Sequence, residues 1–213
     1  MNSYVCDKGM FTKLVEQSYD LNEYNATYRG TRFLTGFETH CLHTLLERLP
    51  DNPSILDLGC GCGYPYDKFL IDEGCKLTGI DISKRQVSLA VSNCPNGKFM
   101  RKDFTDYVSE NTYDGVISLY SLFHVPREYH KRILRNMWES LKEHGTVLIT
   151  VYTKDTGSFK RKNNWCGQPM LWSNYDAATF YDIAESVGFI IKSLGNEIDF
   201  GSSESHVWTL LIK

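Results

Sequence analysis

Nine residues, Ile55-Leu56-Asp57-Leu58-Gly59-Cys60-Gly61-Cys62-Gly63, carry the most informative pattern in the chain. They begin as a short apolar run with one acid and end with glycine at every second position. Glycine has no Cβ and adopts positive φ readily, so such a loop lets a ligand approach the backbone closely. The G-x-G-x-G spacing differs from the G-x-G-x-x-G dinucleotide fingerprint. The pattern predicts a buried strand, a ligand-binding turn and then a helix.

Two more acids follow at the ends of the next two predicted strands. Gly79-Ile80-Asp81-Ile82-Ser83 places Asp81 24 positions after Asp57, near the place expected for a carboxylate that binds two ribose hydroxyls. In Arg101-Lys102-Asp103-Phe104, Asp103 could accept from an exocyclic amine and the Phe104 N–H could reach the ring. Three acids at successive strand ends predict one nucleoside-shaped ligand. Alternatively, the glycines only form a tight turn and the acids only cap helices, since Asp81 and Ser83 suit N-cap positions.

Predicted strands and helices alternate through most of the chain. The strands are expected at Ser54–Leu58, Lys76–Ile80, Lys98–Arg101, Tyr113–Leu119, Thr146–Tyr152, Phe189–Leu194 and His206–Ile212. The helices are expected at Phe33–Leu49, Pro65–Glu73, Lys84–Asn93, Arg127–Glu143 and Ala177–Val187. The last two strands have no helix between them, which predicts a terminal antiparallel hairpin. The fold class is therefore α/β, with a doubly wound, mostly parallel sheet and helices on both faces.

Composition excludes several classes of protein. No apolar run approaches the roughly 20 residues that span a bilayer, and the first 13 residues lack the apolar core of a secretory signal. The net charge is −3, and the basic stretch Lys160-Arg161-Lys162 is too small for duplex nucleic acid. Seven scattered cysteines in a chain of this size predict reduced thiols. We therefore expect a cytoplasmic protein that binds neither membrane nor nucleic acid.

A metal site is not predicted either. Cys60 and Cys62 form a C-x-C pair inside the glycine loop. Neither a second cysteine pair nor clustered histidines complete a set of four ligands.

Taken together, the motifs resemble those of the class I S-adenosylmethionine-dependent methyltransferases. The resemblance rests on Asp57-Leu-Gly-Cys-Gly-Cys-Gly, Gly-Ile-Asp81-Ile-Ser, Lys-Asp103-Phe and Tyr113-Asp-Gly-Val-Ile-Ser-Leu119, and it covers roughly residues 55–213. It implies a Rossmann-like sheet of seven strands with the last one antiparallel, and S-adenosylmethionine as the cofactor. The implied cofactor contacts are Asp57, Gly59, Cys60 and Gly61 for the methionine end, Asp81 for the ribose, Ile82, Asp103 and Phe104 for the adenine, and the Leu119 backbone for the amine.

The length of the chain and its lack of a linker predict its domain organisation. At 213 residues, with no Pro/Gly linker, it suits a single domain. We expect an N-terminal helical cap over 1–50, a cofactor-binding core over 54–152, a lid-like connection over 153–175 and a closing helix and hairpin over 176–213.

The N-terminal cap contains Tyr19, Tyr24 and Tyr28 with Arg29, in a segment that commonly folds over the site in this family. Tyr28 is expected to contact the cofactor, because aromatic faces near a sulfonium gain cation–π attraction of roughly 0.5 to 2 kcal/mol. Alternatively, these tyrosines only cover an edge of the core.

The chemistry needs little from the protein, because the sulfonium already makes the methyl group electrophilic. Alignment can lower the barrier by roughly 7 to 11 kcal/mol. A base is needed only for an acceptor that is protonated, and it adds roughly 10² to 10⁴ in rate. His124, just beyond the fourth strand, is the first candidate, with Tyr120 and Tyr19 as further ones. Alternatively, His124 only satisfies backbone groups before the next helix.

Comparison with other classes of methyltransferase limits the kinds of acceptor that we expect. After the fourth strand the chain has Ser118-Leu-Tyr-Ser121. It lacks the Asn/Asp-Pro-Pro-Tyr/Phe turn of DNA amino-methyltransferases, the acids of catechol-type enzymes and the paired glutamates of arginine methyltransferases. These differences favour metal-free methyl transfer to a small-molecule O, N or S nucleophile. A non-catalytic cofactor-binding regulator or complex subunit, and an NAD-dependent oxidoreductase, are the alternatives. The acceptor and the oligomeric state stay open.

Overall fold

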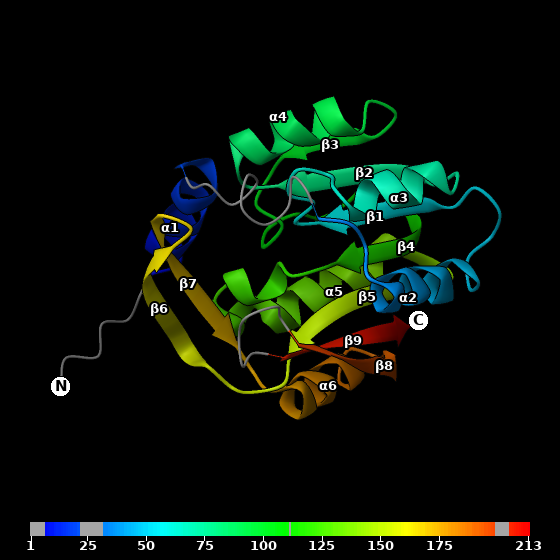
Figure 1. Cartoon of the computed structure of the whole chain (residues 1–213). Coiled ribbons are helices and arrows are strands. Elements are labelled where there is room, and N and C mark those ends of the chain that lie inside the picture. The colour runs from blue at the N-terminus through cyan, green and yellow to red at the C-terminus, as the bar shows by residue number, and fades with distance from the viewer. Residues whose placement is uncertain (1–6, 22–31, 111, 199–204) are drawn as a thin grey trace.

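The computed structural model describes residues 7–21, 32–110, 112–198 and 205–213 (Figure 1). The strands are β1 (Ser54–Leu58), β2 (Lys76–Asp81), β3 (Lys98–Arg101), β4 (Tyr113–Ser118), β5 (Leu141–Tyr152), β6 (Gly157–Trp165), β7 (Gln168–Asn174), β8 (Ile190–Ile198) and β9 (Ser205–Ile212). The α-helices are α1 (Lys8–Leu21), α2 (Gly36–Leu46), α3 (Tyr66–Asp72), α4 (Lys84–Asn93), α5 (His130–Ser140) and α6 (Ala177–Glu185).

Seven of the strands form one sheet with the order β3-β2-β1-β4-β5-β9-β8. β1 pairs in parallel with both β2 and β4, so the direction of winding reverses between β1 and β4. β9 runs antiparallel to both of its neighbours, β5 and β8. The predicted fold class is therefore confirmed. In open α/β sheets a ligand binds at the carboxyl ends of the strands beside such a reversal, which is where the Gly59–Gly63 loop leaves β1.

Two hydrophobic cores lie on opposite faces of this sheet, because successive residues of a strand point to opposite sides. In β1, Leu56 packs in the core with side chains of α5 and α6, whereas Ile55 packs with those of α2 and α3. Val116 and Ile117 of β4 divide between the two cores in the same way. Helices thus cover both faces (Figure 1), and each fully buried aliphatic side chain contributes roughly 1.5 to 3 kcal/mol.

α2 begins at Gly36, three residues later than the expected start at Phe33. Thr35 caps the helix, since its Oγ1 accepts a hydrogen bond from the Glu38 N–H at 3.1 Å. Glu38 Oε2 in turn accepts from the Thr35 N–H at 2.8 Å, which completes a capping box.

The helix predicted over Arg127–Glu143 is wrong at both ends. Residues Arg127–Tyr129 form a 3-10 turn, α5 covers only His130–Ser140, and β5 begins at Leu141 rather than Thr146. Leu141 pairs with Tyr113 of β4 ahead of a bulge in the ladder. Pairing between distant segments therefore ends the helix earlier than the sequence pattern suggests.

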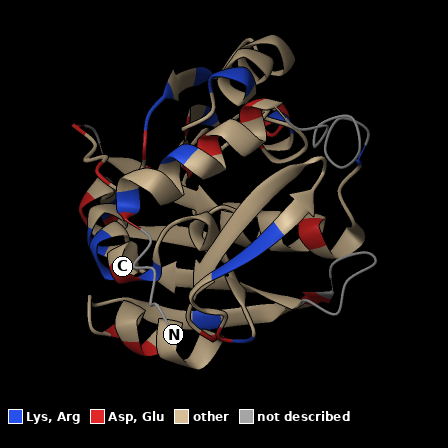
Figure 2. Cartoon of the chain, turned by 90° about the vertical axis from the view of Figure 1, so that its left-hand side faces the viewer, with Lys and Arg blue, Asp and Glu red and all other residues tan. Residues whose placement is uncertain are grey.

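The segment expected to be a long connection over 153–175 contains a β-hairpin. β6 and β7 pair antiparallel, and the turn between them contains Cys166 at φ 49° and Gly167 at φ 84°. Met170 to Asn174 of β7 are buried, whereas β6 is exposed and presents Lys160, Arg161 and Lys162 as a basic band (Figure 2). Mixed charges and large rings obscured the period-2 pattern that would have predicted these strands.

Within residues 1–50, for which we expect a helical cap, the structure describes the helices α1 and α2. It packs Phe11 and Val15 against Met170 and Trp172 of β7, and it lies beside β7 in Figure 1. Residues 22–31 of the cap lie outside the described residues. Among the helices that the structure describes, none has the length and apolar character to cross a membrane.

Candidate functional site

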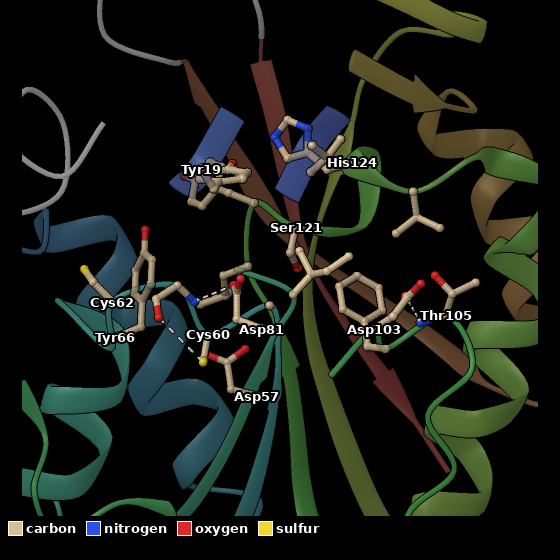
Figure 3. Close-up of a pocket in the computed structure, with 18 of the residues that line it drawn as sticks. Tyr19, Asp57, Cys60, Cys62, Tyr66, Asp81, Asp103, Thr105, Ser121 and His124 are labelled. Carbon is tan, nitrogen blue, oxygen red and sulfur yellow. Dashed lines mark hydrogen bonds between the residues drawn. The ribbon is translucent and has the colours of Figure 1, made fainter. Parts of the chain in front are cut away.

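A pocket lies at the carboxyl ends of the central strands, with α1 on one side (Figure 3). The predicted site residues that line it are Tyr19, Asp57, Gly59, Cys60, Gly61, Asp81, Ile82, Asp103, Phe104, Leu119, Tyr120 and His124. Tyr28 lies in the segment 22–31, outside the described residues. The fold therefore brings together, in one pocket, residues that lie more than 100 positions apart in the sequence.

The glycine loop forms one wall of the pocket with its backbone. The N–H groups of Gly59 and Cys60 both donate to the Ile80 carbonyl, at 2.8 and 3.1 Å, which ties the loop to β2. Gly59 has φ +93°, and a Cβ there would lie 2.4 Å from the Ser121 Cβ. A Cβ on Gly61, by contrast, would have no neighbour closer than 3.9 Å. The loop thus requires glycine for packing at one position and leaves open space at the other.

Asp81 closes β2 and holds the loop in place. Its Oδ2 accepts a hydrogen bond from the Gly61 N–H and its Oδ1 from the Ser83 N–H, both at 2.9 Å. Desolvation raises the pKa of Asp81 to about 6, and these backbone hydrogen bonds oppose the rise. Ser83 also caps α4 by accepting from the Gln86 N–H, so the N-cap expected from the sequence coexists with a carboxylate that lines the pocket.

Asp103 lies at the far end of the pocket, beyond β3 (Figure 3). Its Oδ1 accepts a hydrogen bond from the Thr105 N–H at 2.8 Å. The ammonium of Lys8, at the start of α1, lies 3.8 Å from its Oδ2. This contact joins α1 to the end of the sheet, and Phe104 beside it lines the pocket.

Tyr120 follows β4 with φ +56°, a conformation that is uncommon for a side chain of this size. Its N–H donates to Thr150 Oγ1 at 2.7 Å, and its hydroxyl donates to Glu197 on β8. Desolvation and the neighbouring Tyr66 and Glu197 raise the pKa of Tyr120. A phenol with a raised pKa stays protonated and has no phenolate to accept a proton, so the arrangement favours a role in shaping the pocket wall over proton transfer.

His124 lies above Ser121 and beside Tyr19 of α1 in Figure 3. The Tyr19 and His124 rings meet edge to face with centroids 5.5 Å apart. His124 Nδ1 lies 2.9 Å from the Leu171 carbonyl, which can only accept, so Nδ1 carries the proton and Nε2 has the lone pair. Desolvation lowers the pKa of His124 to about 4. The imidazole is therefore neutral at physiological pH, and Nε2 carries its lone pair.

Sequence reasoning did not single out several lining residues. They are Thr12, Val15, Tyr64, Tyr66, Thr105, Ser121 and Val125. Ser121 had a local signal, since it follows the fourth strand, and its Oγ donates to the Leu58 carbonyl at 2.7 Å. Thr12 and Val15 had none, because only the packing of α1 brings them to the pocket.

The chain matches the family model described as "Methyltransferase domain" over residues 30–194. An uncharacterized methyltransferase of Alkaliphilus oremlandii is 21% identical over 208 residues, covering 94% of this chain and 95% of that protein. Phosphoethanolamine N-methyltransferase 2 of Caenorhabditis elegans is 26% identical over 143 residues, 64% of this chain. The chain matches only 32% of the length of that enzyme and of its Triticum aestivum relative.

Solved structures share the fold. The 1,6-didemethyltoxoflavin-N1-methyltransferase of Burkholderia thailandensis, with 1,6-didemethyltoxoflavin and S-adenosylhomocysteine bound, aligns with a TM-score of 0.75 at 15% identity, covering 100% of this chain and 93% of that one. Magnesium protoporphyrin IX methyltransferase of Synechocystis PCC 6803 aligns with a TM-score of 0.71 at 18% identity, covering 95% of this chain and 100% of that one. With the family match over most of its length, the chain belongs to the class I S-adenosylmethionine-dependent methyltransferases.

Proposed function

We propose that the pocket transfers a methyl group from S-adenosylmethionine to an O, N or S atom of a small molecule, without a metal ion. The observation that carries this proposal is the meeting of Asp57, Asp81 and Asp103 in one pocket beside the glycine loop. The residues fit such a ligand, because the space next to Gly61 is open, with no atom within 3.9 Å of its absent Cβ. Family membership supports the same cofactor.

Each end of the pocket suits one part of the cofactor. Asp81 would accept from the ribose hydroxyls while keeping its bond to the Gly61 N–H. Asp103 and Phe104 would contact the adenine edge, with Ile82 against the adenine ring. The methionine end would lie along Asp57, Gly59, Cys60 and Gly61, with its amine near the Leu119 backbone; all of these residues line the pocket.

S-adenosylmethionine, when bound, supplies a methyl group on a positively charged sulfur that a nucleophile can attack in line. The protein's part is to align the acceptor and to exclude water, which is worth roughly 7 to 11 kcal/mol. α1 provides the cover, since Thr12, Val15 and Tyr19 line the pocket from that side. His124 Nε2 is free of the Leu171 bond and would take the acceptor proton where the acceptor carries one.

Further observations support the acceptor class, the location and the domain organisation in the proposal. The toxoflavin-type and porphyrin acceptors named for two structural neighbours favour a small-molecule acceptor. The net charge of −3 favours an acceptor other than nucleic acid. Six described cysteines are free thiols, five of them buried, which suits the reducing cytoplasm. We also propose that residues 1–213 form a single domain, with the β6–β7 hairpin and α1 covering the core.

The first test is calorimetric titration of S-adenosylmethionine and S-adenosylhomocysteine into the wild type, Asp81→Ala and Asp72→Ala. We expect micromolar binding to the wild type, which corresponds to roughly 8 kcal/mol. Asp81→Ala should weaken binding at least about 30-fold, because it removes an acceptor of the ribose hydroxyls and of the Gly61 N–H. Asp72, 58% exposed and paired with Lys68, is the control whose replacement should change nothing.

The same titration separates the alternatives. Binding of NAD but not of S-adenosylmethionine would overturn the proposal in favour of an oxidoreductase. Tight binding of S-adenosylmethionine without methyl transfer to any phenol, amine or thiol in a radiolabel assay would favour a cofactor-binding regulator.

A further inference from the structure

Asp67 is a buried carboxyl group that the proposed mechanism does not use. It lies in the first turn of α3, and only 1% of its surface is exposed. Its side chain neighbours that of Asp57, which is 4% exposed and lines the pocket. Neither oxygen of Asp67 accepts a hydrogen bond from an N–H or hydroxyl donor among the described residues. Asp57 is therefore a neighbour with which this buried carboxyl group can share a hydrogen bond.

A hydrogen bond between two carboxyl groups requires a proton on one of them, because two carboxylates can only accept. The titratable groups that face Asp67 are Asp57 of β1, Cys62 of the glycine loop and Cys94 at the end of α4, with Cys60 also in range. All of these are acids, so none favours a second negative charge. Desolvation first, and Asp57 second, raise the pKa of Asp67 well above its usual range.

We propose that Asp67 is a positioning residue that carries the proton at neutral pH and donates it to Asp57. The pair then presents one carboxylate of fixed orientation to the pocket, instead of two that repel each other. A ligand-contacting group that is held by a second residue needs no reorganisation when the ligand binds. The inference rests on the proposed function, in which Asp57 lies at the methionine end of the cofactor.

Calorimetric titration of S-adenosylhomocysteine tests the positioning role. Asp67→Asn keeps a donor to Asp57 and should bind within about twofold of the wild type, whereas Asp67→Ala removes the donor and should weaken binding roughly tenfold. Asp72→Asn, on the exposed side of the same helix, is the matched control. Equal affinity of Asp67→Ala and the wild type would overturn the proposal. So would a loss in Asp67→Asn as large as in Asp67→Ala, since it would show that an ionised Asp67 is needed.

The proton itself has a readout that does not involve the cofactor. The infrared difference spectrum of wild type minus Asp67→Asn at pH 7.5 should contain the carbonyl stretching band of a protonated carboxyl group, and absence of that band would contradict the proposal. If Asp67→Ala fails to fold, this spectrum and Asp67→Asn still decide the question. Failure of the wild type to bind would overturn the proposed function, while the spectrum would still report on Asp67.

A second readout is the pH dependence of stability. The folded-state pKa of Asp67 is raised, so its favourable contribution is complete below the unfolded pKa of roughly 4 and is lost as pH rises towards the folded value. Within that window the unfolding equilibrium constant of the wild type should rise by up to tenfold per pH unit relative to that of Asp67→Asn. Parallel urea titrations from pH 5 to 8 would show it, and parallel curves would contradict a shared proton.

Discussion

At the scale of single residues, hydrogen bonds to neighbouring groups determine the protonation and orientation of the side chains that line the pocket. The Leu171 carbonyl selects the tautomer of His124, so that Nε2 is the basic nitrogen. The Glu197 carboxylate accepts from Tyr120 and, at 3.2 Å, from the Trp208 indole, which holds the tyrosine against the wall. His124 and Tyr120, both candidate bases in the sequence, thus occupy different environments.

His124→Asn should keep the donor to the Leu171 carbonyl and lose the basic nitrogen. With an acceptor that must lose a proton, we expect kcat to fall by roughly 10² to 10⁴ while S-adenosylhomocysteine affinity stays within about twofold. Steady-state kinetics and calorimetry check the two parts. An unchanged kcat with a protonated acceptor would assign His124 a structural role. Because its pKa is about 4, activity above pH 6 should not depend on titration of His124.

Gly59→Ala and Gly61→Ala should distinguish the role of the glycine loop in stability from its role in ligand binding. An added Cβ at position 59 would lie 2.4 Å from the Ser121 Cβ, so this variant should be strongly destabilised. At position 61 the space is open, and only the positive φ of 54° costs free energy, roughly 1 to 2 kcal/mol. We expect Gly61→Ala to fold but to bind S-adenosylhomocysteine more weakly, because residue 61 lines the pocket and its backbone would be strained. Thermal unfolding with and without the ligand measures both effects.

At the scale of elements, the pocket depends on α1 and the β6–β7 hairpin, which lie outside the central sheet. α1 packs on β7 through Phe11 and Val15, and the Ser18 hydroxyl donates to the Pro169 carbonyl. Lys8 pairs with Asp106 beyond β3, and Asp20 accepts from Ser83 at the start of α4. The helix is therefore fixed at both ends to the edge of the sheet that contains the pocket.

Phe11→Ala should weaken the packing of α1 on β7 and so loosen the helix that covers the pocket. Phe11 is 1% exposed, and removing such a ring costs roughly 3 to 5 kcal/mol. Met10, 55% exposed on the same helix, is the matched control, and Met10→Ala should change stability by less than about 0.5 kcal/mol. Hydrogen exchange should show faster exchange in α1 of Phe11→Ala, with weaker binding of S-adenosylhomocysteine. Unchanged exchange in α1 would contradict a covering role for this contact.

At the scale of the whole molecule, stability depends on buried titratable groups in several places. Burial lowers the pKa values of His124 and His130 to about 4, from 6.5 when exposed. A lowered pKa means that the unfolded chain binds more protons between these values, so stability is present above pH 6.5 and is lost as pH falls towards 4. Asp81, with its raised pKa, acts in the opposite direction over pH 4 to 6.

His130→Gln isolates one of these contributions. Gln can donate to the Val125 carbonyl, as His130 Nε2 does at 3.2 Å, but it does not titrate. Between pH 6.5 and 4 the wild type should lose up to about 3 kcal/mol more of its unfolding free energy than this variant. The exposed His40 gives the control His40→Gln, which should follow the wild type. Urea unfolding at a series of pH values is the measurement, and superimposed curves for wild type and His130→Gln would contradict the prediction.

The sequence by itself determined the sheet, its terminal hairpin and the three acids at the strand ends. Those features follow from local spacing: a strand's apolar pattern places Asp57 and Asp81 at its end, and Gly59 to Gly63 permit the turn that follows. The sequence predicted an N-terminal cap, but it did not reveal how α1 packs on β7 to cover the pocket. It also did not reveal the β6–β7 strands, the hydrogen bond from Tyr120 to Glu197 or the burial of Asp67 beside Asp57. These contacts join elements through packing and hydrogen bonds across the fold, and no periodicity or spacing in the chain encodes which side chains will meet. Only the tertiary structure decided them, because burial, which depends on every neighbouring element, sets both the partners and the pKa values of the groups concerned.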